Sequence, residues 1–303
     1  MIVMRQLNIF IFLILLMISC NSSESKESVS KQETINKSVE DNSILSNNNS
    51  NNNTYTDSQE EYFDKDSENS SNIIYKGGWP YNPNKDQMID VGFKDCNSIP
   101  YGNGCECTED SQCLQESECE ILFTSQNCLP KAGAQLPNFI GIDQFGDSVN
   151  LYDFANQDKL ILIEVSTMWA KPGNAMAEWL AGNPETIETM RWWQDNFNQV
   201  KDLIDAGDIY YIRVLHQGSI KNDIITDNDI LYWQDAYSHT NIINLADPQA
   251  NLKTWVRPTG YPCFMLFNPD MSLHTPAEGV NGDAQRRRGL KAPFEATINY
   301  LQK

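Results

Sequence analysis

Cysteine is the residue type that offers this sequence the most chemistry. A thiolate can attack a disulfide, become oxidised or bind a metal, and two thiols can pair with each other. The chain has eight cysteines. One lies near the N-terminus at Cys20, and another stands alone at Cys263. The other six lie close together, at Cys96, Cys105, Cys107, Cys113, Cys119 and Cys128.

The six clustered cysteines are expected to form disulfides. Six cysteines allow fifteen pairings, and the sequence does not choose among them. In "CEC", Cys105 and Cys107 could bond to each other as a strained, oxidising pair, or each could bond elsewhere in a structural knot; we favour the knot. A zinc site is a further alternative, but it needs free thiolates in a compartment where disulfides persist. We expect no metal, and there is no Gly-rich phosphate loop to indicate another cofactor.

Residues 1–19 predict export from the cytoplasm. Arg5 precedes an apolar run, Ile9–Ile18, of about ten residues, whereas a helix that spans a bilayer needs roughly 20. "LLMISC" resembles a bacterial lipobox, which implies cleavage before Cys20 and a lipid attached to its thiol. A plain secretory peptide is the alternative. Asn21 differs from the Asp that retains some lipoproteins at the inner membrane, so we expect an outer-membrane anchor facing the periplasm or the outside.

The charge balance excludes one large class of partner. The net charge of -19 argues against nucleic acid, whose phosphates require Lys and Arg. Part of the acidity lies in residues 20–75, where stretches such as "SNNNSNNNTYT" have almost no apolar periodicity. Such a segment cannot bury enough surface to offset the entropy of ordering. We interpret it as a disordered tether; binding to a cell wall or a partner is the alternative.

Two further parts follow the tether. Residues 76–132 hold the six clustered cysteines, show no strong helix or strand period, and contain too few apolar residues for a core of their own. We expect a small module held by disulfides. Residues 133–303 are enough for one domain.

The apolar pattern of this domain predicts an α/β fold with a central mixed sheet flanked by helices. A strand, a helix and a strand in succession imply parallel pairing through a crossover. The helix after "GNP" carries a long apolar stripe and ends at Gly207. The expected elements are a hairpin at 139–154, a strand at 160–165, a helix at 184–206, a strand at 209–215, a helix at 229–237, a hairpin at 263–274 and a helix from 291.

This domain resembles the redoxin branch of the thioredoxin-like superfamily, which includes antioxidant proteins and anchored thiol–disulfide oxidoreductases. Four segments carry the resemblance, in the family's order and spacing, over most of residues 135–275. They are "GIDQFGDSVNLYDF", "LILIEVSTMWAKPG", "IYYIRVL" and "ADPQANLKTWVRPTGYPCFMLFNPDMSL".

The resemblance implies roles for the stretch "WAKPG". Trp169 and Pro172 match the family pattern, but Ala170 stands where the attacking cysteine would be and Gly173 where the resolving cysteine would be. Thiol exchange requires a thiolate, which neither residue provides. Lys171 could stabilise an anion at this helix start.

The resemblance also assigns Pro262, in "TGYPC", to the family's cis-proline, which exposes neighbouring backbone to substrate. Cys263 follows it directly and would lie near the same helix start. Two readings remain open: a displaced reactive thiol, or a buried small apolar side chain at the start of a core strand.

Taken together, the residues predict a lipid-anchored, extracytoplasmic redoxin-like protein whose usual active site has lost its cysteines. It would bind an extended protein or peptide partner beside Trp169 and Pro262. The alternative is a thiol–disulfide oxidoreductase or antioxidant enzyme that uses Cys263, with or without a cysteine of the module. The substrate or partner and the oligomeric state are not evident from the sequence.

Overall fold

The computed structural model describes residues 73–122, 125–279 and 290–300, which belong to one compact unit. The predicted export signal, Cys20 and nearly all of the tether lie outside these residues. No helix in the described part is long and apolar enough to cross a membrane.

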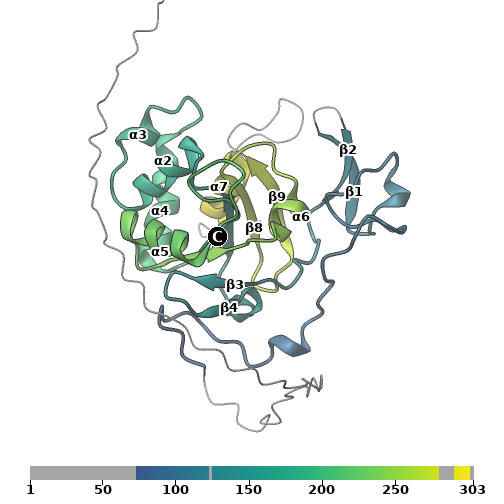
Figure 1. Cartoon of the computed structure of the whole chain (residues 1–303), viewed down its shortest axis with the longest axis horizontal. Coiled ribbons are helices and arrows are strands. Elements are labelled where there is room, and N and C mark those ends of the chain that lie inside the picture. The colour runs from purple at the N-terminus through teal and green to yellow at the C-terminus, as the bar shows by residue number, and fades with distance from the viewer. Residues whose placement is uncertain (1–72, 123–124, 280–289, 301–303) are drawn as a thin grey trace, which may run out of the picture. The chain divides into compact units, whose positions relative to one another are not determined.

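The centre of the domain is a mixed sheet with the strand order β4-β3-β7-β6-β5-β8-β9 (Figure 1). Strands β5, β6 and β7 run parallel, while β8, β9 and the β3–β4 hairpin pair antiparallel. The order β6-β5-β8-β9, with one parallel and two antiparallel pairings, is a thioredoxin-like arrangement, and the predicted central mixed sheet is confirmed. The strands are β3 (Ile140–Asp143), β4 (Ser148–Asn150), β5 (Ile161–Ser166), β6 (Tyr210–Leu215), β7 (Ile242–Ala246), β8 (Cys263–Phe267) and β9 (Leu273–Gly279).

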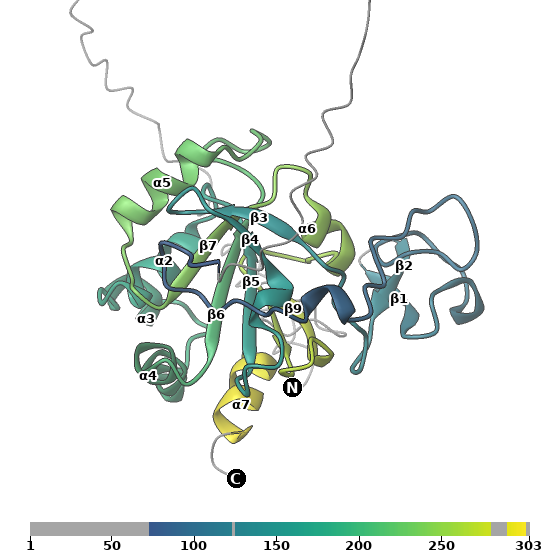
Figure 2. The same cartoon turned by 90° about the horizontal axis from the view of Figure 1, so that it is seen from below.

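Helices cover both faces of this sheet (Figure 2). One face packs against α2, α4, α5 and α7, and the other against α6 and the segment from Tyr75 to Met88. The expected helix after β6 and the terminal helix are present as α5 and α7. The helices are α2 (Lys171–Leu180), α3 (Glu185–Glu188), α4 (Asn198–Ala206), α5 (Asp227–Ala236), α6 (Asn251–Val256) and α7 (Lys291–Tyr300), with 3-10 turns η1 (Lys85–Gln87), η2 (Asp110–Gln112), η3 (Leu151–Phe154) and η4 (Asp195–Phe197).

The prediction of a single long helix at 184–206 is wrong. The chain instead forms the short α3, turns, η4 and then α4, which ends at Gly207 in the left-handed conformation (φ 74°). The break lets Trp193 turn inward to pack edge-on against Trp179 of α2, with ring centroids 4.9 Å apart. Tertiary packing of aromatic rings thus overrides a continuous helical stripe.

Strand β7 and helix α6 were not predicted. The run "IINLA" is short and lies between polar residues, so it carries little local signal. In the structure β7 is fully buried, pairs in parallel with β6 and contacts β3, which joins the N-terminal hairpin to the sheet.

The cysteine-rich module is more regular than predicted, because β1 (Ser117–Leu122) and β2 (Ser125–Pro130) form an antiparallel hairpin. All six cysteines are disulfide-bonded. The pairs are Cys96–Cys105, Cys107–Cys119 and Cys113–Cys128. The two cysteines of "CEC" therefore have different partners, as the knot interpretation required. Sulfurs of Cys107, Cys113 and Cys128 lie within 4.8 Å of one another, but in disulfides they are not thiolate metal ligands.

A glycine brings the module against α6. Gly104 has φ 86°, and a Cβ built there would lie 2.0 Å from the carbonyl oxygen of Thr254. Both the backbone conformation and this close approach exclude other residues. Figures 1 and 2 accordingly show the β1–β2 hairpin beside α6.

A buried ion pair links the two central strands beneath the helices. Arg213 of β6 donates from Nε to Oε2 of Glu164 of β5 at 2.7 Å, and Tyr211 donates to the same oxygen. Both charged side chains are fully buried. Burial alone would lower the pKa of Arg213, but the Glu164 carboxylate raises it above its usual value.

Breaking this pair is expected to cost much more than breaking an exposed one. Arg213→Met leaves a buried carboxylate without its counter-charge and should lower the free energy of unfolding by about 3–5 kcal/mol. Lys201→Met, which removes the helical surface pair with Asp205, should cost less than about 1 kcal/mol. Urea unfolding of both variants measures the contrast; equal losses would contradict it. The double variant Glu164→Leu/Arg213→Met should recover much of the loss.

Candidate binding site at the start of helix α2

Helix α2 starts where β5 ends, at the position that carries the attacking cysteine in the family resemblance. Ala170 is the N-cap residue in an extended conformation and makes no side-chain cap, and Pro172 lies in the first turn. Ala170 is buried and Lys171 is exposed. The helix start keeps its unpaired N–H groups and positive dipole end, but no side chain here can form a covalent bond with a thiol.

Gly173 is packed against the strand below it. A Cβ built on Gly173 would lie 2.6 Å from Oγ of Ser166, a fully buried residue at the end of β5. Contacts this short force a neighbour to move. Among the described residues, Ser166 Oγ has no hydrogen-bond partner. The serine therefore occupies the space that the first atom of a resolving cysteine's side chain would need.

The loop before β8 contains the predicted cis-proline. The Tyr261–Pro262 peptide bond is cis, and the Ile99–Pro100 bond of the module, which was not predicted, is cis as well. Within the part of the chain that the structure describes, no hydrogen bond uses the backbone N–H or C=O of Gly260 or Tyr261. These groups are therefore available to an extended chain laid beside the loop.

Two aromatic rings form one wall of this region. The rings of Trp169 and Tyr261 meet edge-on with centroids 6.0 Å apart. Nε1 of Trp169 donates to Oε1 of Gln217 at 2.6 Å, and Nζ of Lys221 lies 5.4 Å from the Trp169 ring. The loop after β6 thus fixes the orientation of Trp169, which remains partly exposed.

Sequence reasoning missed a row of polar residues at the ends of the parallel strands. Thr167, His216 and Asp247 directly follow β5, β6 and β7, and all three are buried. The register places them side by side on the sheet face that packs against α6. Such a row was detectable, because the carboxyl ends of parallel strands are where α/β sheets bind ligands, and each residue follows an apolar run.

The members of this row have different partners. Asp247 accepts from the N–H groups of Asn251 and Leu252, each at 3.0 Å, and so caps the start of α6. Nε2 of His216 lies 3.0 Å from the hydroxyl of Tyr261. Nδ1 of His216 and Oγ1 of Thr167 are buried without a hydrogen-bond partner among the described residues.

Burial dominates the electrostatics of His216. Desolvation, assisted by the nearby positive charge of Lys253, lowers the pKa of His216 to about 4. The imidazole is therefore neutral at pH 7 and suits a hydrogen-bonding role more than an ionic one. Burial also raises the pKa of Asp247, although its bonds to backbone N–H groups oppose that rise.

Cys263 lies on the opposite side of the sheet from α2. It pairs with Val165 across β5 and β8, and both side chains belong to the core beneath α6. Its exposed fraction is 1%. The structure thus places Trp169, Ala170, Lys171, Pro172, Gly173 and Pro262 around the start of α2, and directs the thiol of Cys263 into the core.

No protein-family model and no curated protein sequence matches this chain. Solved structures align with it. The exposed lipoprotein thioredoxin of Streptococcus pneumoniae strain TIGR4 aligns at 14% identity over 52% of this chain and 98% of its own, with a TM-score of 0.35. A thiol peroxidase from Chromobacterium violaceum aligns at 16% identity over 57% and 87%, with a TM-score of 0.38. A protein described as thiol:disulfide interchange protein DsbE from Chlorobium tepidum aligns at 14% over 57% and 96%, also at 0.38. Because these identities and TM-scores are low, the assignment of the fold rests on the strand order and not on these alignments.

Restoring the second cysteine should be unfavourable. Gly173→Cys overpacks against Ser166 and should lower the free energy of unfolding by about 1–3 kcal/mol. In a Ser166→Ala background the same change should cost clearly less, because the clashing hydroxyl is gone. A double-mutant cycle by urea unfolding measures this coupling. Additive losses would show that Ser166 does not restrict this position.

The buried histidine should make stability depend on acid. Because the folded-state pKa lies below the unfolded value of about 6.5, the unfolded state binds the proton first, and stability falls as pH drops below that value. Between pH 7 and pH 4.5 this group should account for about 2.5 kcal/mol of lost stability. His216→Gln keeps a polar side chain but cannot titrate. Over the same pH range, the free energy of unfolding of this variant should therefore fall by about 2.5 kcal/mol less than that of wild type. Identical pH profiles would contradict a neutral, buried His216.

Proposed function

We propose that this protein is an extracytoplasmic thioredoxin-like binding protein that holds an extended polypeptide beside the cis-Pro262 loop and does not exchange disulfides at the start of α2. The packing of Gly173 on Ser166 carries this proposal. The sequence places no sulfur at Ala170 or Gly173, and a Cβ added at Gly173 would lie 2.6 Å from the Ser166 hydroxyl, which would have to move.

The other cysteines support the same reading. The six in the module are consumed in three disulfides, and Cys263 is 1% exposed within the core beneath α6. A thiol acts as a nucleophile only as an accessible thiolate, and burial in apolar surroundings works against both conditions.

The surface beside Trp169 and cis-Pro262, which is the proposed polypeptide groove, offers features that suit an extended chain. Unpaired backbone groups at Gly260 and Tyr261 can pair with a strand, and Trp169 offers a partly exposed ring for side-chain contact. Ile220 and Ile224, in the loop that carries Lys221, are about two-thirds exposed, at 65% and 66%. They extend the apolar rim of this region.

The charges near the groove favour an acidic partner. Lys171 follows Ala170, Lys221 lies over Trp169, and Arg257 starts the loop that leads to Pro262. These cations border the proposed site and would attract acidic segments, although the exposed Asp223 shares the loop of Lys221.

The proposed location follows from the disulfides together with the N-terminal sequence. Three disulfides within a small module are typical of oxidising compartments. The lipobox-like "LLMISC" supports a lipid on Cys20, and Asn21 supports an outer-membrane anchor. We place the domain at the cell envelope, tethered outside the cytoplasm.

The proposed role predicts a protein that has no thiol–disulfide exchange activity but binds acidic peptides. Wild type should show no insulin reduction and no peroxidase activity. It should bind a short unstructured Glu-rich peptide more tightly than the same peptide with Lys in place of Glu, with affinity that falls as salt rises. Trp169→Ala should weaken binding roughly tenfold, a loss of about 1.4 kcal/mol. Fluorescence anisotropy of the labelled peptides measures these affinities.

A matched control is available on α5. Tyr232 is an aromatic residue with 67% exposure that lies outside the groove, so Tyr232→Ala should leave binding unchanged. The proposal would be contradicted if wild type reduces insulin and Cys263→Ser does not. That result would favour the oxidoreductase alternative.

A further inference from the structure

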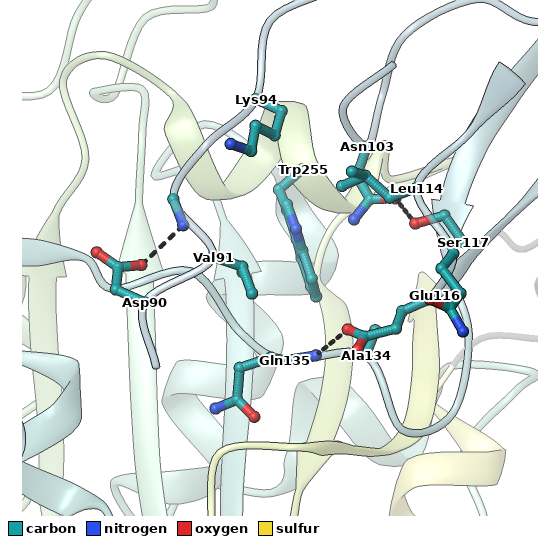
Figure 3. Close-up of a pocket in the computed structure, with 12 residues that line it drawn as sticks. Asp90, Val91, Lys94, Asn103, Leu114, Glu116, Ser117, Ala134, Gln135 and Trp255 are labelled. Atoms are coloured by element: carbon teal, nitrogen blue, oxygen red, sulfur yellow. Dashed lines mark hydrogen bonds between the residues drawn. The ribbon is translucent and has the colours of Figure 1, made fainter. Parts of the chain in front are cut away.

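A cavity lies away from the α2 site, where the disulfide module meets helix α6. It has a volume of about 340 Å³. Its walls come from the module, from the chain at residues 90–94, and from Ala134 and Gln135, with Trp255 of α6 among them (Figure 3). This size lies at the lower end of the range for small-molecule sites.

A rigid aromatic ring forms part of the wall. Trp255 is only 4% exposed and belongs to the core beneath the sheet, where its ring lies 6.4 Å from that of Phe267. Figure 3 shows its indole in the middle of the lining residues, with Val91 on one side and Leu114 on the other. A ligand would meet the small exposed part of a fixed indole ring, between aliphatic neighbours.

Hydrogen bonds fix the orientation of the polar groups around this ring. Oγ of Ser117 donates to Oδ1 of Asn103 at 2.7 Å, so the amide nitrogen of Asn103 is left pointing toward the space beside Trp255 (Figure 3). Asn103 is 7% exposed, and no hydrogen bond within the described ranges uses that nitrogen. Oε2 of Glu116 accepts from the backbone N–H of Gln135 at 3.2 Å, which leaves Oε1 as an acceptor.

We propose that this cavity binds a carbohydrate of one or two rings. A pyranose has a C–H face that can lie on an indole ring and hydroxyl groups that both donate and accept. It would accept from the Asn103 amide and donate to the Glu116 carboxylate while its C–H groups touch the exposed part of Trp255.

Other ligand classes fit these groups less well. A purely apolar ligand would bury the Asn103 amide without a partner, which is costly. An anion would meet Glu116, and a cation would meet Lys94, since both side chains line the cavity. Asp90 adds little to either case, because its Oδ1 accepts from the N–H groups of Gly92 and Asn138. A neutral molecule rich in hydroxyl groups satisfies the donor and the acceptor together.

The carbohydrate site is independent of the proposed polypeptide groove. The two use different residues: Asn103, Glu116 and Trp255 here, and Trp169, Gly260 and Tyr261 there. Either can fail experimentally without affecting the other.

Saturation-transfer difference NMR on the purified full-length chain tests the assignment. The probes are a panel of neutral, amino and acidic pyranosides, as methyl glycosides and disaccharides. At least one should receive saturation, strongest at its ring C–H protons. Asn103→Asp, which replaces the donor with an acceptor, and Glu116→Ala should each weaken its affinity about tenfold. Glu106→Ala, an exposed module position outside the cavity, should leave it unchanged.

Three results would overturn the proposal. The first is no transfer to any pyranoside while the disulfides and the near-UV circular dichroism are those of the folded chain. The second is transfer that survives both Asn103→Asp and Glu116→Ala, which would place the sugar elsewhere. The third is transfer to free tryptophan or lysine, but to no pyranoside, which would assign the cavity to amino-acid side chains.

Discussion

The two hydrogen bonds that Asp247 accepts at the start of α6 anchor the helix that borders both proposed binding sites. They fix a helix of only six residues directly onto the end of β7. That helix presents Trp255 to the cavity of the module, and its carbonyl at Thr254 lies against Gly104. It then leads through Arg257 into the loop that ends at cis-Pro262. One buried carboxylate therefore anchors a helix that lies next to two separate surfaces.

At the start of α2 the fold keeps its architecture and changes its chemistry. The helix N-terminus, the cis-proline and the tryptophan beside them remain, while the groups nearby are a neutral imidazole and hydroxyls. Each of these groups can form hydrogen bonds, and none readily forms a covalent bond with sulfur. Under the proposed function, such a surface would bind a polypeptide and release it unchanged.

Much of the fold could be predicted because its signals are local. The branched apolar run of β5 and the glycine after α4 each depend on a few consecutive residues. What could not be predicted depends on pairing across the chain. The face to which Cys263 points follows from its register with Val165, the disulfide partners from the shape of the module, and the break before α4 from the packing of Trp193 on Trp179. Of the candidate site, the motif positions were evident, whereas the buried row at the strand ends emerged only once β7 was in place.

The contact between Gly173 and Ser166 also bears on how such a protein can change over generations. A first mutation that brings back the second cysteine meets an occupied space, and a first mutation that clears the space brings back no thiol. Neither step alone yields a working dithiol, and the position of Ala170 still has to change as well. A dithiol at this place would therefore require changes at both Ala170 and Gly173, together with a movement of the Ser166 hydroxyl.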